Sequence, residues 1–310
     1  MGLVVVGSIA FDALKSPFGE RERTLGGSAV HCSLAASYFT DVRVVGPVGD
    51  DFGEEEYAVL RRHGVNTDDV EQVEGGRTFF WAGEYEWNVN IRHTLDTQLN
   101  VFGDFQPKLS EASKSSETLF LANIQPDLQR EVREQCEGAG LAALDSMNYW
   151  IETARDSLLR TIATVDMLLM NDDEVRMLTE QPTLLGGVRQ LMELGPKVVV
   201  VKQGEYGAAL FTAEGFFSLP AYPLERVLDP TGAGDSFAGG LLGYLDAQGA
   251  AVDDAILRRA LTYGSAVASF WVEEFGCERA ERLTREEIDS RYDAFRRMTS
   301  IEGVPASDSA

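Results

Sequence analysis

Residues 229–240, DPTGAGDSFAGG, place small residues directly before an acid at the start of an apolar stretch. Apolar residues at four-residue spacing from Phe237 onward predict a helix that begins near Ala233. Amide groups at a helix N-terminus have no partners within the helix and carry partial positive charge. Because Gly232, Ala233 and Gly234 have little or no side chain, an anion can reach these amides.

Asp235 would lie in the first turn of this helix, beside the bound anion. A carboxylate repels a phosphate, so this position suits a carboxylate that accepts a proton from an attacking hydroxyl. The pattern therefore indicates phosphoryl transfer, with amides that hold the phosphate and an acid that acts as base. The alternative is an acid that only complements the helix dipole, worth about 0.3–1 kcal/mol. The stretch matches neither G-x-x-x-x-G-K-[ST] nor G-x-G-x-x-G.

The complete string resembles the C-terminal signature of the ribokinase-like (PfkB) carbohydrate kinase family, and the resemblance extends over roughly residues 3–297. It implies an α/β fold, a three-layer sandwich with a mostly parallel sheet, plus a small β lid. It also implies that Asp235 is the catalytic base and that residues 232–234 form the anion hole.

The same resemblance assigns acceptor binding to residues in the first half of the chain: Asp12, Gly26, Gly27, His31 and Asn123. The glycines belong to LGGS at 25–28, where the backbone would approach the acceptor. His31 is a departure, because the family often has Asn four residues after the second glycine. A lone histidine on a helix is also explained by a structural role, so this position leaves the sugar specificity open.

The nucleotide site implied by the resemblance involves KQGEYG at 202–207, where Lys202 and Gly204 would border ATP together with Asn171 and Thr231. The alternative for this segment is a plain hairpin turn. LDSMNYW at 144–150 loosely resembles a D-x-N-x-R segment that lacks its arginine. Its candidate residues are Asp145 and Asn148.

NDDE at 171–174 is similar to the family's N-x-x-E motif, which implies that Glu174 and Asn171 hold Mg²⁺ partly through water. Asn followed three residues later by Glu is also close to a capping box, and both roles can coexist. Mg²⁺ takes few protein ligands and many waters, which suits so sparse a site. The resemblance also suggests a K⁺ site near Asp229 and Thr231.

Strands and helices alternate along most of the chain, which predicts one α/β domain over residues 1–300 with helices on both faces of a parallel sheet. Predicted strands include 3–7, 42–49, 118–123, 140–145 and 165–171, and 197–204 with 207–212 forms a hairpin. Predicted helices include 27–39, 51–65, 126–137, 152–163, 172–179, 184–194, 253–271 and 284–297. The lid comprises 11–25 and 77–103, and 301–310 is a loose tail.

Residues 77–88 alternate with period two, which places Phe79, Trp81, Tyr85 and Trp87 on one face of a strand. We expect this aromatic face to pair two lids in a homodimer, because apolar patches of that size are uncommon on monomers. Two alternatives are stacking on the base of a nucleoside acceptor and packing on the lid's own loops.

The chain carries 50 acidic and 27 basic residues, a net charge of -23. This charge argues against nucleic acid as a partner. It predicts adaptation to concentrated salt, and the alternative is the codon bias of a GC-rich genome. Three widely spaced cysteines predict a reducing compartment without disulfides, so we expect a cytoplasmic protein. No apolar stretch is long enough to cross a membrane, so no membrane partner is expected.

These observations predict a kinase that moves the γ-phosphoryl of ATP to a hydroxyl, with Mg²⁺ required. The acceptor is a small molecule, a sugar with a hydroxymethyl group or, alternatively, a nucleoside. An inactive nucleotide-binding regulator is a competing hypothesis, which the intact Asp235 disfavours. A nicotinamide-dependent oxidoreductase is disfavoured because G-x-G-x-x-G does not follow the first strand.

Overall fold

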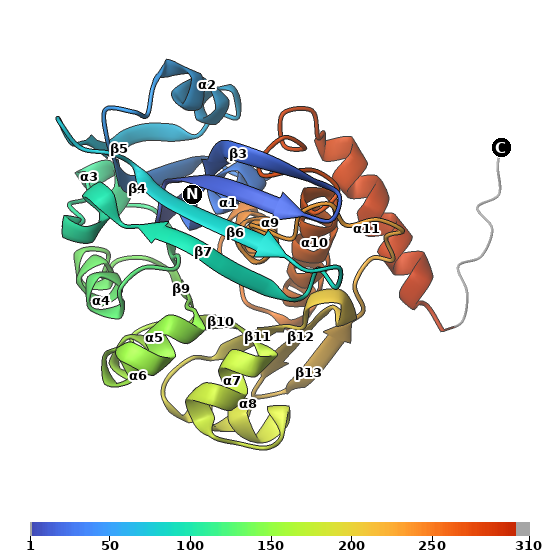
Figure 1. Ribbon diagram of the computed structural model, residues 1–310. Helices are drawn as coiled ribbons and strands as arrows, with labels where there is room; N and C mark the ends of the chain where they lie inside the picture. The colour runs from blue at the N-terminus through green and yellow to red at the C-terminus, as the bar shows by residue number, and fades with distance from the viewer. Residues whose placement is uncertain (1, 302–310) are drawn as a thin grey trace.

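The computed structural model describes residues 2–301 and contains two sheets (Figure 1). The large sheet has the strand order β13-β12-β11-β10-β9-β8-β1-β4-β5. From β11 to β5 every neighbouring pair is parallel, and β12 and β13 add an antiparallel edge. The predicted mostly parallel α/β sheet, with the hairpin that follows Lys202, is therefore confirmed.

The strands of the described residues are β1 Leu3–Val6, β2 Ala10–Ser16, β3 Gly19–Gly26, β4 Val42–Val48, β5 Asn66–Gln72, β6 Phe79–Tyr85, β7 Arg92–Gln98, β8 Thr118–Leu121, β9 Leu141–Asp145, β10 Met167–Asn171, β11 Val198–Lys202, β12 Ala208–Thr212 and β13 Gly215–Leu219. The helices are α1 Ser28–Ala36, α2 Glu54–Arg62, η1 Asn100–Asp104, α3 Glu111–Lys114, α4 Pro126–Gln135, α5 Asn148–Thr153, α6 Arg155–Ile162, α7 Asp172–Thr179, α8 Leu184–Glu193, η2 Gly204–Tyr206, α9 Ala233–Ala247, α10 Asp254–Trp271 and α11 Arg285–Thr299.

Alternate residues of the central strand β1 belong to two separate apolar cores. Leu3 and Val5 pack in one core with residues of α1, α9, α10 and α11. Val4 and Val6 pack in the other with residues of α4, α6, α7 and α8. Strands buried on both faces are typical of parallel sheets covered by crossover helices, and the three layers follow from this arrangement.

Glycines bring α9 close to α1 at the centre of one layer. A Cβ atom at Gly239 would lie 2.3 Å from the carbonyl oxygen of Cys32, and one at Gly243 would lie 2.8 Å from that of Ala36. Larger residues would push the helices apart. The close packing holds α1, which carries His31, next to the N-terminal half of α9.

The second sheet has the order β3-β2-β6-β7 and joins two distant chain segments, 10–26 and 79–98 (Figure 1). β2 and β6 pair in parallel, with Phe11 opposite Phe80 and Asp12 opposite Trp81. These strands fall within or next to the segments expected to form a lid. Of the expected tail, residues 302–310 lie outside the described part of the chain.

The sequence missed five strands, β2, β3, β5, β7 and β13, and predicted one helix where there are two. Three of these strands, β3, β5 and β7, are mostly polar, and β13 is short. These four are outer strands of their sheets, where no apolar pattern is required. The helix expected over 152–163 is divided at Ala154 into α5 and α6. Within residues 2–301, no helix is both long and apolar enough to cross a membrane.

Candidate active site

The N-terminus of α9 is open, as the sequence predicted. Gly232 is its N-cap with φ of 73°, in the left-handed region that favours glycine, and no side chain caps the helix. The amide of Ala233 donates to the carbonyl of Pro230. Within residues 2–301, the amides of Gly234 and Asp235 have no protein acceptor. The first turn of α9 therefore offers free donors to an anion.

Two basic side chains lie against this turn, which explains why it is built from small residues. A Cβ atom at Gly232 would lie 2.5 Å from Cγ of His31. A Cβ atom at Gly234 would lie 3.2 Å from Nζ of Lys202. The ammonium group of Lys202 therefore lies beside the open amides, where it can add to the attraction for a phosphate.

Asp235 is held in an environment that favours its protonated form. Burial raises the pKa of its carboxyl group, and the charges of Asp145 and Asp12 raise it further, while His31 and Lys202 oppose them. The groups that influence Asp235 come from four different elements, so the fold brings the predicted residues around one point. A carboxylate with a raised pKa is a stronger base than an exposed aspartate.

Lys202 forms an ion pair with Asp145, with 2.5 Å between Nζ and Oδ2. Burial by itself lowers the pKa of Lys202, but Asp145 and Glu174 outweigh it and raise the pKa above the ordinary value. Lys202 is therefore charged. Its partner Asp145, one of the two candidates from the loosely matching segment, is part of the site, whereas Asn148 is exposed at the start of α5.

Glu174 and Asn171 form the capping box that the sequence offered as an alternative. The amide of Asn171 donates to Oε2 of Glu174 at 2.8 Å, and the amide of Glu174 donates to Oδ1 of Asn171 at 2.7 Å. Burial raises the pKa of Glu174 to about 7, and Lys202 lowers it. Within residues 2–301, no three His, Cys, Asp or Glu side chains converge as a metal site. One buried carboxylate with a free oxygen fits a Mg²⁺ ion that keeps most of its waters.

Asp12 is buried beside the glycine pair expected to approach the acceptor. A Cβ atom at Gly26 would lie 2.0 Å from Oδ2 of Asp12, and Gly27 has φ of 96° with its Cβ position 2.4 Å from the carbonyl oxygen of Ser8. Both positions therefore require glycine. Nε2 of His31 lies 3.9 Å from Oδ2 of Asp12. The acceptor residues predicted from LGGS thus lie together.

Asp229 is buried and accepts hydrogen bonds from two backbone amides. Its Oδ1 accepts from Thr231 and its Oδ2 from Gly276, each at 2.9 Å. Burial raises the pKa of Asp229. Within residues 2–301, no Lys or Arg side chain forms an ion pair with it.

Two predicted residues have mainly structural contacts. Asn123 accepts a hydrogen bond from Nε1 of Trp150 and contacts Sδ of Met147. Gly204 has φ of 56° in the turn between β11 and β12, which is the plain turn considered in the sequence. Their contacts neither add them to the group around Asp235 nor exclude ligand binding.

The second sheet contributes residues that the sequence did not place in the site. The hydroxyl of Tyr85 hydrogen-bonds to Oγ1 of Thr231 at 2.8 Å, and Nδ2 of Asn90 donates to Glu205 at 3.0 Å. Arg92 lowers the pKa values of Glu174 and Tyr85. The period-two pattern predicted which residues share a face of β6. It could not show that this face looks toward the loop before α9.

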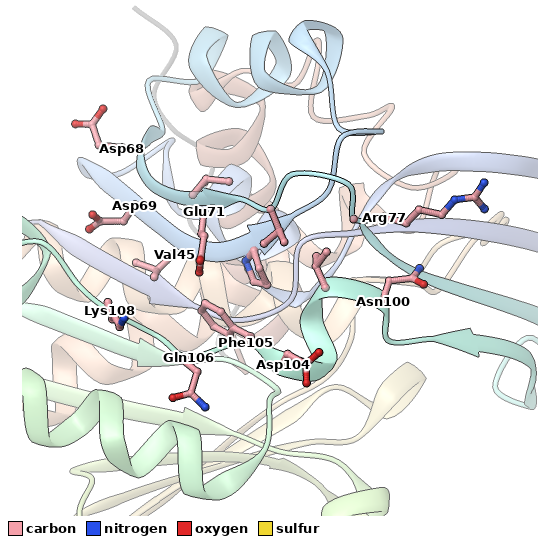
Figure 2. Close-up of a pocket in the computed structure, with 15 residues that line it drawn as sticks. Val45, Asp68, Asp69, Glu71, Arg77, Asn100, Asp104, Phe105, Gln106 and Lys108 are labelled. Atoms are coloured by element: carbon pink, nitrogen blue, oxygen red, sulfur yellow. The ribbon is translucent and has the colours of Figure 1, made fainter.

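A separate cavity of about 760 Å³ lies beside β5, η1 and the loop after it, with Glu71, Asp104 and Gln106 among its lining residues (Figure 2). The predicted site residues do not line it. It also carries both signs of charge, because Arg77 and Lys108 accompany the acids. This cavity is therefore distinct from the group around Asp235.

Several curated proteins are similar to this chain. A cytidine kinase from Thermococcus kodakarensis is 28% identical over 79% of this chain and 88% of its own length. A nucleoside kinase from Methanothermobacter thermautotrophicus is 28% identical over 97% of this chain and 96% of its own. A probable fructokinase-3 from Arabidopsis thaliana is 26% identical over 89% of this chain and 85% of its own.

Solved structures share the fold. A Burkholderia thailandensis nucleoside kinase in complex with ADP-inosine has a TM-score of 0.80 at 19% identity, covering 94% of this chain and 95% of its own. An E. coli protein in complex with ATP and Mg²⁺ has a TM-score of 0.78 at 20% identity, covering 94% and 99%. A pfkB family carbohydrate kinase model matches residues 3–282. The resemblance inferred from the sequence is thereby confirmed, and the chain belongs to the pfkB family of carbohydrate kinases.

Proposed function

We propose that this kinase transfers the γ-phosphoryl group of ATP to the hydroxymethyl group of a nucleoside. The carrying observation is Asp235, a partly buried acid with a raised pKa in the first turn of a helix that no side chain caps. An acid in that position has a chemical use only when a hydroxyl must lose a proton beside a bound phosphate.

In the proposed reaction Asp235 takes the proton of the acceptor hydroxyl while the oxygen of that hydroxyl bonds to the γ-phosphorus. The bond between that phosphorus and the bridging oxygen of ADP breaks, so the products are the phosphate ester, ADP and a proton. In the proposed anion hole of residues 232–234, the free amide of Gly234, the adjacent amide of Asp235 and the ammonium of Lys202 would offset the charge on the transferred group. Asp12, Gly26 and Gly27 would hold the acceptor, and Gly204, Asn171 and Thr231 would border ATP.

Mg²⁺ would be held by Glu174 and Asn171, largely through water, and supplies neutralisation of phosphate charge when bound. The similar E. coli structure in complex with ATP and Mg²⁺ supports this assignment. We assign a K⁺ site to Asp229 and Thr231, because the buried carboxylate has backbone donors but no cationic side chain in the described residues.

Trp81 favours a nucleoside over a free sugar as acceptor. It lies directly opposite Asp12 in the β2–β6 register, so the two side chains share a face of the second sheet. The ring is partly exposed, and Arg92 lies over it at 5.3 Å from the ring centroid. An aromatic face beside the hydroxyl-binding acid suits stacking on a base, which is worth about 1–3 kcal/mol. The names of two relatives, cytidine kinase and nucleoside kinase, agree with this choice.

The test is ADP release with ATP, Mg²⁺ and a panel of acceptors that includes cytidine, inosine, ribose and fructose, at several KCl concentrations. We expect turnover with at least one nucleoside. Trp81→Ala should raise the KM for that nucleoside roughly tenfold or more and leave any KM for sugars unchanged. Equal effects on both would favour a sugar acceptor. No ADP release with any acceptor would favour the inactive nucleotide-binding regulator.

We also propose a homodimer that forms through the lid. β7 is an edge strand of the second sheet and all its residues are exposed, Leu95 among them. Trp87 is 82% exposed at the end of the aromatic run. Phe79 instead stacks on Phe102, and Tyr85 contacts Thr231, so the interface would use the edge and tip of the sheet. Light scattering in high salt should give twice 34.0 kDa, and a monomer mass would refute the dimer.

Two further properties follow from composition. Three unpaired cysteines, all buried, and ATP as phosphoryl donor support a cytoplasmic location. The excess of acids, 50 against 27 basic residues, supports adaptation to salt. Tm should therefore rise steadily from low salt to molar KCl, where the Debye length falls to about 3 Å. A flat Tm would instead indicate codon bias.

A further inference from the structure

His31 lies between two parts of the proposed site and has an unused hydrogen-bonding atom. The side chain is buried, with 1% of its surface exposed. Its Nδ1 accepts a hydrogen bond of 2.9 Å from the indole nitrogen of Trp271. Its Nε2 is buried and has no hydrogen-bond partner within residues 2–301. A buried polar atom without a partner is uncommon and calls for an explanation.

The contact with Trp271 determines which ring nitrogen of His31 carries the proton. An indole N–H can only donate, so Nδ1 must present its lone pair and the proton must be on Nε2. Burial lowers the pKa of His31, whereas Cys277 and Asp12 raise it above its ordinary value. Sγ of Cys277 donates to the carbonyl oxygen of Leu25 and lies 3.4 Å from the same Nδ1. Because the indole N–H of Trp271 occupies the lone pair of Nδ1, the geometry favours the neutral Nε2–H tautomer.

The acceptor for this N–H must come from the protein, because the surface of Nε2 is too buried for a ligand to reach. Oδ2 of Asp12 is 3.9 Å away, which is about 1 Å longer than a normal hydrogen bond. Catalytic hydrogen bonds in ligand-free structures are often long and shorten when substrate binds. The Cβ position of Gly26 lies 2.0 Å from this same Oδ2, so Gly26 has to be glycine for the carboxylate to occupy this place. A shift of about 1 Å between the two side chains would bring Nε2 and Oδ2 to hydrogen-bond distance.

We propose that Trp271 fixes His31 as the neutral Nε2–H tautomer and that this N–H holds the carboxylate of Asp12 in position for the acceptor hydroxyl. His31 is then a positioning residue that acts through Asp12, not a residue that binds the acceptor directly. The proposal rests on the proposed function in one respect, since it takes Asp12 as the acceptor-binding acid.

The same ring also supports the anion-binding turn. A Cβ atom at Gly232 would collide with Cγ, Nδ1 and Cδ2 of His31, so the ring lies flat against the N-cap of α9. A charged His31 ring would lower the pKa of Asp235, and a neutral ring does not have this effect. One side chain thereby connects the acid that binds the acceptor with the loop that holds the phosphate.

The tautomer can be tested without any enzymatic activity. The chain has three histidines, so ring ¹⁵N–¹H correlation spectra of the labelled full-length protein at pH 7.5 are readily assigned with His31→Gln. We expect a neutral Nε2–H pattern for His31 that is lost or mixed in Trp271→Phe. The Nε2 proton should also shift in Asp12→Asn, because its acceptor changes from a carboxylate to an amide. An imidazolium or Nδ1–H pattern, or a proton unaffected by Asp12→Asn, overturns the proposal.

Kinetics test the positioning role, with cytidine and fructose as probe acceptors. His31→Leu keeps the bulk but removes the donor, and should raise the acceptor KM about 10- to 100-fold with the KM for ATP unchanged. His31→Gln places an amide N–H near the same point and should recover most of this loss. His63→Leu, on α2's C-terminal side against Tyr38, is the matched control. An acceptor KM unchanged in folded His31→Leu overturns the proposal. If the wild type phosphorylates neither probe, the acceptor class fails instead, and the spectra still decide the tautomer.

Discussion

The helices α7 and α9 begin in the same region of the protein, but only the N-terminus of α7 is capped by side chains. At α7 the side chains of Asn171 and Glu174 each accept a hydrogen bond from the other's backbone amide. At α9 the N-cap is Gly232, and no side chain caps the helix. Asp235 holds the same third position after the N-cap in α9 that Glu174 holds in α7. Within residues 2–301, however, its carboxylate accepts no hydrogen bond from the amides of its own helix end.

The difference shows that a helix N-terminus can serve either stability or ligand binding, depending on whether side chains cap its amides. A helix end that satisfies its own amides is stable without a ligand. One that leaves them free is stabilised when an anion binds. Lys202 lies between the two ends, because it influences the pKa values of both Glu174 and Asp235. We therefore expect damage at α9 to affect chemistry and damage at α7 to affect metal dependence and stability.

The largest effect is expected from Asp235→Asn, which keeps the shape but removes the proton acceptor. We expect kcat to fall about 10²- to 10⁴-fold with little change in ATP binding. Asp172→Asn is the matched control, since it removes an acid from the first turn of α7 that pairs with Arg176. Steady-state ADP release for both variants makes the comparison. If Asp235→Asn keeps more than about a third of the wild-type kcat, Asp235 is not the base.

The sequence predicted much of this arrangement because its signals are local. The spacing of Gly232 and Asp235 predicts the open N-terminus of α9. The spacing of Asn171 and Glu174 predicts a capping box. The covered parallel strands were predicted for the same reason, since burial on both faces makes them continuously apolar. β5 and β7 were not, because polar edge strands carry no such pattern.

Long-range contacts could not be predicted in the same way. The ion pair of Lys202 with Asp145 joins residues 57 positions apart, and the Trp271–His31 bond joins residues 240 apart. The aromatic run showed a similar limit. Its period gave the shared face of Trp81 and Tyr85, but only tertiary packing decides that Tyr85 contacts Thr231.

An intermediate effect is expected from Gly232→Ala. The new Cβ would collide with the ring of His31, and the left-handed φ of 73° is unfavourable for alanine. We expect kcat to fall roughly 10- to 100-fold as the amides of α9 move. Gly249→Ala is the control, because its φ is 72° with no atom within 4 Å of the Cβ position. The strain of alanine at a left-handed φ should lower the free energy of unfolding similarly in both variants, which denaturant unfolding measures. An equal loss of kcat in both would show that the contact of Gly232 with His31 does not matter for catalysis.

The smallest effect is expected from Glu174→Gln, which keeps much of the cap but removes the charge. The Mg²⁺ concentration for half-maximal rate should rise several-fold, with kcat at saturating Mg²⁺ less affected. The variant also tests the buried charge through stability. An unchanged Mg²⁺ titration with a lower Tm would leave Glu174 as a cap alone.

The pH dependence of stability distinguishes Glu174 from a purely structural cap. Because burial raises its pKa from 4.5 to about 7, the folded protein binds this proton more tightly than the unfolded chain. Without Mg²⁺, the free energy of unfolding should therefore fall by up to about 3 kcal/mol as pH rises from about 4.5 through 7, and Glu174→Gln should not show this fall. Glu287 caps α11 with the same geometry, but Arg279 lowers its pKa. Glu287→Gln should instead lose a stabilising contribution that is present above pH 4.5 and lost as pH falls. Thermal unfolding from about pH 3 to 8 covers both pH ranges. Parallel curves for wild type and Glu174→Gln would show that the buried carboxylate is not destabilising.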